Sequence, residues 1–226
     1  MISSRYIIVL ISAITCRRNA GPDIIRAGSM KESKTVSNKR PEKRHPTIGV
    51  CGLDCGMCPR YYTEGPSRCP GCAGPGFFEK HPTCSFITCC VKNKNLEVCS
   101  ECPDFPCPKN KTAGEYEQVK ESSSYPSYKK AAPNLLFIKQ HGIRPFMEQQ
   151  EKRIKWLEIM IKNYDEGRSR SFFCKAAIFL DLASLKSSLD RADRKMQTEK
   201  IQRNDIKSKA KIIRAIINEM APGGWK

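Results

Sequence analysis

Eleven of the 13 cysteines in this chain of 226 residues fall between Cys51 and Cys107. The densest stretch is CGLDCGMC, residues 51–58, in which thiols occupy the first, fifth and eighth positions. Clustering of this kind indicates a local module that its cysteines hold together. Disulfides, zinc and an iron–sulfur cluster are the three chemistries that use thiols in this way.

The spacing of the cysteines favours a metal. Three C-x-x-C units are present, at residues 55–58, 69–72 and 99–102. Two intervening residues allow both sulfurs to face one ion. Full disulfide pairing of eleven cysteines would leave one thiol over. The candidate metal ligands are Cys51, Cys55, Cys58, Cys69, Cys72, Cys84, Cys89, Cys99, Cys102 and Cys107.

Zinc and iron–sulfur are harder to separate. Zinc sites with four cysteines are commonly built from two C-x-x-C units, so residues 55–58 and 69–72 would form one site. The 99–102 unit would form a second site with two of the remaining cysteines. Those remaining cysteines are Cys84, Cys89, Cys90 and Cys107. Iron–sulfur clusters also take four cysteines, so zinc is the preferred interpretation and an iron–sulfur redox or transfer protein is the alternative.

The opening octet also has the spacing of radical S-adenosylmethionine enzymes, in which three thiolates leave one iron open for the cofactor. Those enzymes need alternating strands and helices after the motif, whereas further cysteines and then helical patterns follow here. The sequence has no phosphate loop, Ser-His-Asp pattern or nucleotide-binding glycines. We therefore assign no catalytic residue and favour a binding protein over an enzyme.

Several separate motifs support a family resemblance. They are VCGLDCGMCPRY, CPGC, CSFITCC and LEVCSECPDFPC, followed by NLLFIKQHGI and YDEGRSRSFFCKAA. Over about residues 48–190 the chain resembles the cysteine-rich domain-of-unknown-function family numbered 3795, known from bacteria and archaea. The resemblance implies metal binding, usually taken to be zinc, and implies no activity.

The N-terminal segment is basic and poor in apolar residues. Residues 1–47 carry 10 Lys/Arg against 3 Asp/Glu, and we expect a disordered extension. Its apolar run, residues 6–15, is shorter than the roughly 20 residues of a membrane span. Met30 is an alternative start, which would leave residues 1–29 untranslated. We expect a cytoplasmic protein without a transmembrane segment.

Residues 111–226 have helical periodicity, and strand signals are sparse. We therefore expect a mainly α protein, in which a small irregular cysteine-rich module, residues 48–110, precedes a helical region. Predicted helix starts lie at Pro133, at Pro145 and at either Ser169 or Ser171, and predicted ends at Gly142 and Gly167.

A last, polar helix is predicted from about Arg191 to Met220. Its residues 191–214 hold nine Lys/Arg against three Asp/Glu, a net charge of +6. Such a helix could bind nucleic acid non-specifically through its phosphates, although a solvated helix face is the commoner explanation. A protein partner is the other expectation.

Three further features have both a structural and a functional interpretation. His81 precedes Cys84 by three residues, but a loop histidine is favoured over a ligand because cysteines are in surplus. Cys174 fits a small buried hydrophobe better than an extra ligand. The stretch YDEGRSR, residues 164–170, fits a helix–helix turn; alternatively, Arg168 and Arg170 could grip a carboxylate or phosphate.

Overall fold

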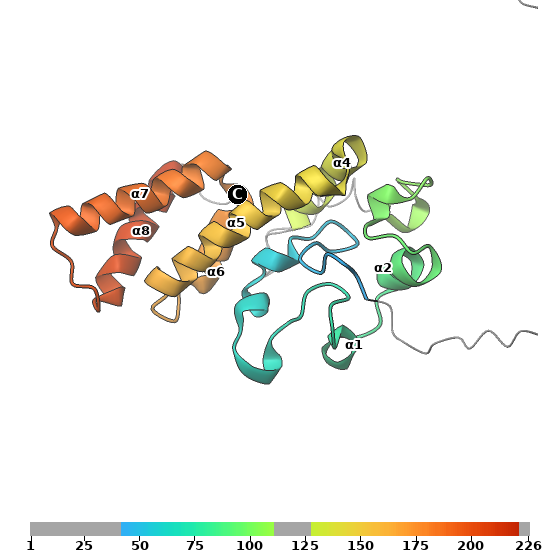
Figure 1. Cartoon of the computed structure of the whole chain (residues 1–226), viewed down its shortest axis with the longest axis horizontal. Coiled ribbons are helices and arrows are strands. Elements are labelled where there is room, and N and C mark those ends of the chain that lie inside the picture. The colour runs from blue at the N-terminus through green and yellow to red at the C-terminus, as the bar shows by residue number, and fades with distance from the viewer. Residues whose placement is uncertain (1–41, 111–127, 222–226) are drawn as a thin grey trace, which may run out of the picture. The chain divides into compact units, whose positions relative to one another are not determined.

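The computed structural model describes residues 42–110 and 128–221, and within these ranges the regular secondary structure is helical without a strand. Residues 42–110 form short helical turns, and residues 128–221 form the long helices (Figure 1). The prediction of a mainly α protein, with an irregular cysteine-rich module followed by a helical region, is confirmed. The predictions for residues 1–41, Met30 among them, lie outside the described residues.

The module is built from helical segments of three to six residues. They are η1 (Cys55–Met57), η2 (Pro59–Tyr62), η3 (Gly65–Ser67), α1 (Phe77–Lys80), α2 (Ser85–Ile87), η4 (Thr88–Asn93), η5 (Cys99–Glu101) and η6 (Pro108–Asn110). Each of η2, η3 and η6 has one proline, which is its first or second residue. Its fixed φ starts a turn readily, and its missing N–H is not needed there.

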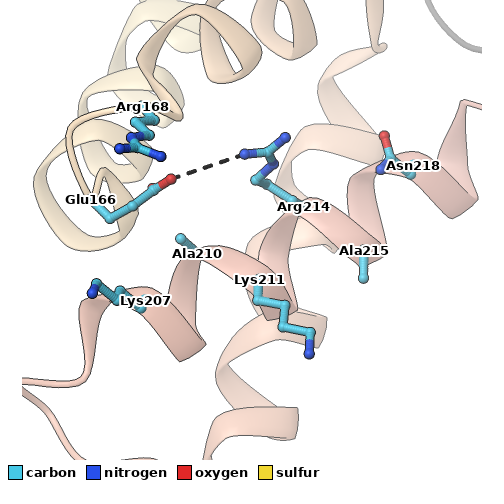
Figure 2. Close-up of a pocket in the computed structure, with 8 residues that line it drawn as sticks. All are labelled: Glu166, Arg168, Lys207, Ala210, Lys211, Arg214, Ala215 and Asn218. Carbon is cyan, nitrogen blue, oxygen red and sulfur yellow. Dashed lines mark ion pairs between the residues drawn. The ribbon is translucent and has the colours of Figure 1, made fainter.

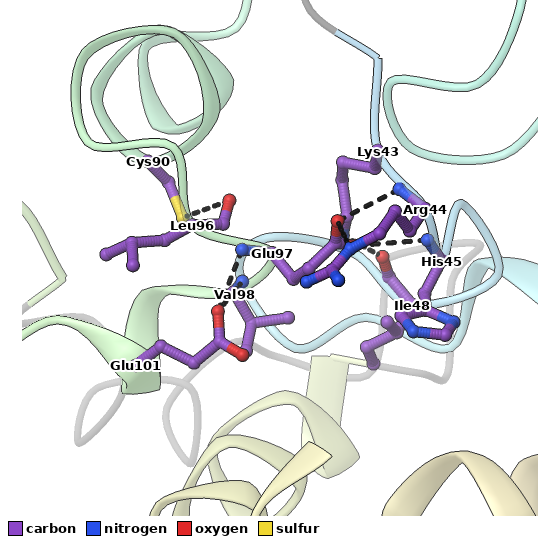
Figure 3. Close-up of polar contacts among 9 residues, drawn as sticks. All are labelled: Lys43, Arg44, His45, Ile48, Cys90, Leu96, Glu97, Val98 and Glu101. Carbon is purple, nitrogen blue, oxygen red and sulfur yellow. Dashed lines mark hydrogen bonds and ion pairs between the residues drawn. The ribbon is translucent and has the colours of Figure 1, made fainter. Parts of the chain in front are cut away.

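Glu97 joins residues 43–45 to the later half of the module (Figure 3). Its carboxylate accepts hydrogen bonds from the backbone N–H of Arg44 (2.9 Å) and of His45 (3.0 Å). Burial alone would raise the pKa of Glu97, but these hydrogen bonds outweigh it and the pKa lies below its ordinary value. Glu101 accepts from the backbone N–H of Glu97 in the same way (2.8 Å). The module's contacts therefore begin near residue 43, before the predicted boundary at residue 48.

Two long helices, α4 (Tyr128–His141) and α5 (Ile143–Tyr164), open the helical region and meet at Gly142, a predicted helix end. Pro133 does not start a helix as predicted, because it lies inside α4 and removes one intrahelical hydrogen bond there. Pro145 is the third residue of α5, within the first turn, where a backbone N–H would have no intrahelical acceptor.

Three shorter helices complete the region: α6 (Arg170–Phe179), α7 (Leu182–Thr198) and α8 (Ile206–Met220). The start of α6 after Ser169 is confirmed. The single polar helix predicted from Arg191 to Met220 is wrong, because α7 and α8 are separate helices that pack side by side (Figure 1).

The break between α7 and α8 has two local causes. Lys200 has a φ of +53°, in the left-handed region that no helix continues through. Asp205 then starts α8 as its N-cap, accepting a hydrogen bond from the backbone N–H of Ser208 (3.1 Å). The apolar residues Ile206, Ile213, Ile217 and Met220 all lie within α8, so the pattern gave no evidence that this helix extended back to Arg191.

Buried apolar side chains of α5 to α8 form one core, and Met57 of the module lies within it. A second cluster joins Ile48 and Val98 of the module to Leu135 of α4 and Phe146 of α5. Burial of apolar area at both places stabilises the contact between the module and the helices. Within the described residues, none of the helices combines the length and apolar character that crossing a bilayer requires.

Gly52 in the CGLDC stretch allows α4 to approach the module closely. Its φ is +89°, and a Cβ atom there would lie 2.2 Å from the carbonyl oxygen of Ala131. Only glycine combines this backbone conformation with such an approach. The residue between two cysteines thus sets the distance to α4.

Asp54, in the same stretch, makes the polar contact between the module and the helices. Its side chain is buried, and its Oδ1 accepts from the amide of Asn134 in α4 (3.0 Å) and of Gln150 in α5 (2.7 Å). The amide of Asn134 also donates to the carbonyl oxygen of Gly52 (2.9 Å). Burial raises the pKa of Asp54 to about 6 despite the two amide hydrogen bonds.

We predict that Asp54→Ala lowers the free energy of unfolding by about 2–4 kcal/mol, because two buried amide donors lose their acceptor. Asp54→Asn is the matched control, since both amides donate to a single oxygen that asparagine keeps, and its effect should be within about 1 kcal/mol. Urea unfolding of both variants measures the difference. Equal losses in the two variants would contradict the role given to the hydrogen bonds.

Candidate metal centre

The clustered cysteines line two cavities. The first thiol cavity has a volume of about 210 Å³, and its lining includes Asp54 and seven thiol or imidazole side chains. These seven are Cys51, Cys55, Cys58, Cys69, Cys72, Cys84 and His81. The second thiol cavity is smaller, about 40 Å³, and is lined by Cys89, Cys90, Cys99, Cys102 and Cys107.

Cys72, in the first cavity, takes part in hydrogen bonds with a second thiol and with a backbone N–H. The side chain of Cys55 hydrogen-bonds to it, and the backbone N–H of Val50 donates to its Sγ (3.4 Å). The Cys55 hydrogen bond, helped by the charge of Lys43, lowers the pKa of Cys72 to about 6. The same hydrogen bond, together with burial, raises the pKa of Cys55 well above its ordinary value. The thiolate is the form of cysteine that binds metal, and Cys72 is the member of this pair whose lowered pKa favours it.

The pKa of Cys51 reflects the burial of its side chain and the closeness of other thiols. Burial, together with the nearby thiols of Cys72, Cys84 and Cys99, raises its pKa to about 12. Thiolates this close together repel one another. A cation bound between them would turn that repulsion into attraction.

His81 lies at the same cavity beside Cys69. Its Nε2 is 3.3 Å from the Cys69 Sγ, and its ring stacks on Phe77 with ring centroids 4.5 Å apart. Burial lowers the pKa of His81, and the charges of Arg60 and Lys80 act in the same direction. The imidazole is therefore neutral at pH 7, the form that coordinates a metal.

The side chain of Lys94 lines the second thiol cavity and contacts one of its cysteines. The Nζ of Lys94 lies 2.9 Å from the Cys102 Sγ and 2.7 Å from Asp104 Oδ2. These two groups, Asp104 first, raise the pKa of Lys94 above its ordinary value. The thiol of Cys90 donates to the carbonyl oxygen of Leu96 (3.4 Å). The ammonium group of Lys94 therefore lies beside the Cys102 side chain, and a metal held by Cys102 would have to displace it.

The donors fit a zinc or iron–sulfur site in kind, since soft thiolates and one imidazole suit both. Within residues 42–110 and 128–221, no group of three or more Cys, His, Asp or Glu side chains is arranged so that it could hold an ion. Coordination at the roughly 2.3 Å of a zinc–sulfur bond therefore requires side-chain rotation into the cavity. None of the twelve cysteines from Cys51 to Cys174, all of them described, forms a disulfide.

The two cavities divide the eleven clustered cysteines into groups of six and five. The units 55–58 and 69–72 line one cavity, as predicted for one site. Cys84, one of the four cysteines that the sequence offered as partners for the 99–102 unit, also lines this first cavity. The remaining candidates of that second group, Cys89, Cys90 and Cys107, do line a cavity with the 99–102 unit.

Other side chains show what the sequence did and did not signal. His81 lines the first cavity, although a loop histidine was favoured, and its position three residues before Cys84 was the available signal. Cys174 is 1% exposed in the helical core, in agreement with the small buried hydrophobe. Lys43 and Lys94 had no sequence signal, because their proximity to thiols follows from the fold alone.

Comparison with known families gives one match. Residues 47–112 match the family described as a protein of unknown function (DUF3795). This is the family that the cysteine motifs resemble, and the matched range holds all eleven clustered cysteines while ending before residues 134–143 and 164–177. Neither curated proteins nor solved structures gave a match.

Proposed function

We propose that residues 43–110 are a metal-binding module, with zinc as the metal, and that the metal orders a surface for a binding partner. The observation that carries the proposal is the first thiol cavity, where six cysteines and a histidine surround about 210 Å³. One ion would be held there by four of these side chains. A second ion would be held by thiols of the second cavity.

The role of the metal would be structural. The module's own core contains six buried residues, Val50, Cys72, Ala73, Ile87, Cys90 and Val91. A core of that size contributes little against the conformational entropy of ordering some 60 residues. Structural zinc binding supplies folding free energy outright, so the ion would be what makes the module fold.

The proposed partner is a protein. Residues 43–110 carry eight Lys/Arg and six Asp/Glu, so the module has little excess charge to attract a phosphate backbone. The proposal also needs reduced thiols, which the cytoplasm maintains. An iron–sulfur cluster, with a redox or transfer role, is the alternative that would use the same thiols.

We predict that Cys72→Ala reduces the bound metal by about one ion per chain, because Cys72 is the thiolate centre of the first cavity. Cys174→Ala is the matched control, since it also removes a buried thiol but lies outside both cavities. Elemental analysis of the purified variants measures the loss, with far-UV circular dichroism confirming that the helices persist. Unchanged metal in Cys72→Ala, or an equal loss in Cys174→Ala, would count against the first cavity as the site.

We further predict that a strong chelator removes amide protection across residues 43–110 while the core of α5 to α8 keeps most of its protection. That core is formed almost entirely by side chains of these helices, with Met57 as the module's contribution. Hydrogen exchange read by mass spectrometry distinguishes the two regions. Unchanged exchange in the module after metal removal would mean that the metal is not structural.

A further inference from the structure

A basic groove lies in the helical region, apart from the thiol cavities. It has a volume of about 640 Å³ and lies between the turn after α5 and one face of α8 (Figure 2). Eight residues line it: Glu166, Arg168, Lys207, Ala210, Lys211, Arg214, Ala215 and Asn218. Four cations against one carboxylate give the lining a net charge of +3. We call it the α8 groove.

One stripe of α8 supplies three of the four cations. Lys207, Lys211 and Arg214 are spaced by four and three residues, so they share a helix face. Ala210 and Ala215 on the same side are small and leave room above the helix. The apolar stripe, which includes Ile213 and Ile217, is buried in the core and fixes this face toward the groove.

The turn that carries Arg168 is rigidly built. Asp165 Oδ1 accepts from the backbone N–H of Gly167 (3.0 Å) and of Ser169 (3.1 Å). Asp165 Oδ2 pairs with the Nε of Arg170 (3.3 Å). The turn predicted for YDEGRSR is therefore present, Arg170 is engaged within it, and Arg168 is the arginine that lines the groove.

Arg214 is held in place across the groove from the turn. Its Nη1 lies 3.3 Å from Ser169 Oγ and 4.0 Å from Glu166 Oε1, and its guanidinium lies 5.0 Å from the Phe172 ring centroid. Figure 2 shows Arg214 facing Glu166, with Lys207 on the same side as Glu166. An arginine oriented in this way loses little side-chain entropy when it binds an oxyanion.

Glu166 has an unused acceptor at the same place. Its Oε1 accepts from Ser169 Oγ (2.9 Å), whereas its Oε2 is buried and has no hydrogen-bond partner. A buried carboxylate oxygen without a donor is costly. A ligand that brings an N–H or O–H group to this oxygen would remove that cost.

We propose that the α8 groove binds a small phosphomonoester that carries an amino or hydroxyl group close to its phosphate. The phosphate would lie among Arg168, Lys207 and Arg214, and the donor would face Glu166 Oε2. A basic surface for nucleic acid would need only the cations. The buried acceptor beside the cations favours a small ligand with both groups.

The test compares two probes that differ only in the donor: O-phosphoethanolamine and ethyl phosphate, each titrated calorimetrically into the intact, metal-replete chain. O-phosphoethanolamine should bind more tightly by about 10-fold or more, the factor expected for a hydrogen bond to a buried charged group. Glu166→Gln should reduce that preference to below about 3-fold, because the acceptor loses its charge.

The role of the cations is tested separately by substituting Arg168 and Lys207, which are exposed, so that their replacement leaves the fold intact. Arg168→Gln and Lys207→Gln should each weaken both probes by roughly 5-fold or more. Lys209→Gln is the matched control, because Lys209 lies on α8 but over the Tyr164 ring, at 5.5 Å, and outside the groove. Its affinities should match those of the unaltered chain.

Several results would overturn the proposal. They are no binding of either probe at millimolar concentration, equal affinity for both probes, or the same weakening in Lys209→Gln as in Lys207→Gln. A single-stranded oligonucleotide that binds with a steep salt dependence, while the probes do not compete, would show a nucleic-acid surface instead. None of these measurements depends on the metal proposal.

Discussion

The crowding of thiols in the first cavity is the constraint on which the rest of the module depends. Burial and neighbouring thiols raise the pKa of Cys51 to about 12, while a hydrogen bond from Cys55 lowers the pKa of Cys72 to about 6. The site can gather several thiolates only if a cation offsets their mutual repulsion, and the apolar core of the module is small. A bound metal would resolve both difficulties at once.

The module and the helices are linked through residues that lie between the cysteines. Gly52 brings the chain close to the α4 backbone, Asp54 binds amides of α4 and α5, and Met57 is buried with α5 to α8. The octet CGLDCGMC therefore has two structural roles. Its cysteines line the cavity, and the residues between them contact the helices, so ordering the cavity would also order the interface.

Local signals in the sequence predicted much of this arrangement. Prolines and glycines marked several helix ends, and the cysteine spacing grouped the 55–58 and 69–72 units. The sequence was less informative where the conformation of a single residue, or a contact between residues far apart in the chain, determines the structure. The break at Lys200 depends on a left-handed backbone conformation that the residue pattern does not signal, and the cavity that Cys84 lines depends on how α2 packs. The partners of Asp54 lie 80 and 96 residues away, beyond the reach of any local pattern.

The α8 groove has the opposite character, since its chemistry is fixed by ordinary protein contacts and needs no metal. Elemental analysis of protein purified without oxygen decides whether the cysteine-rich module holds zinc. The account predicts colourless protein with about two zinc ions per chain, close to full occupancy as expected for structural sites. Brown protein containing iron and sulfide would favour the iron–sulfur alternative. Metal-free protein with most of its cysteines in disulfides would contradict the account.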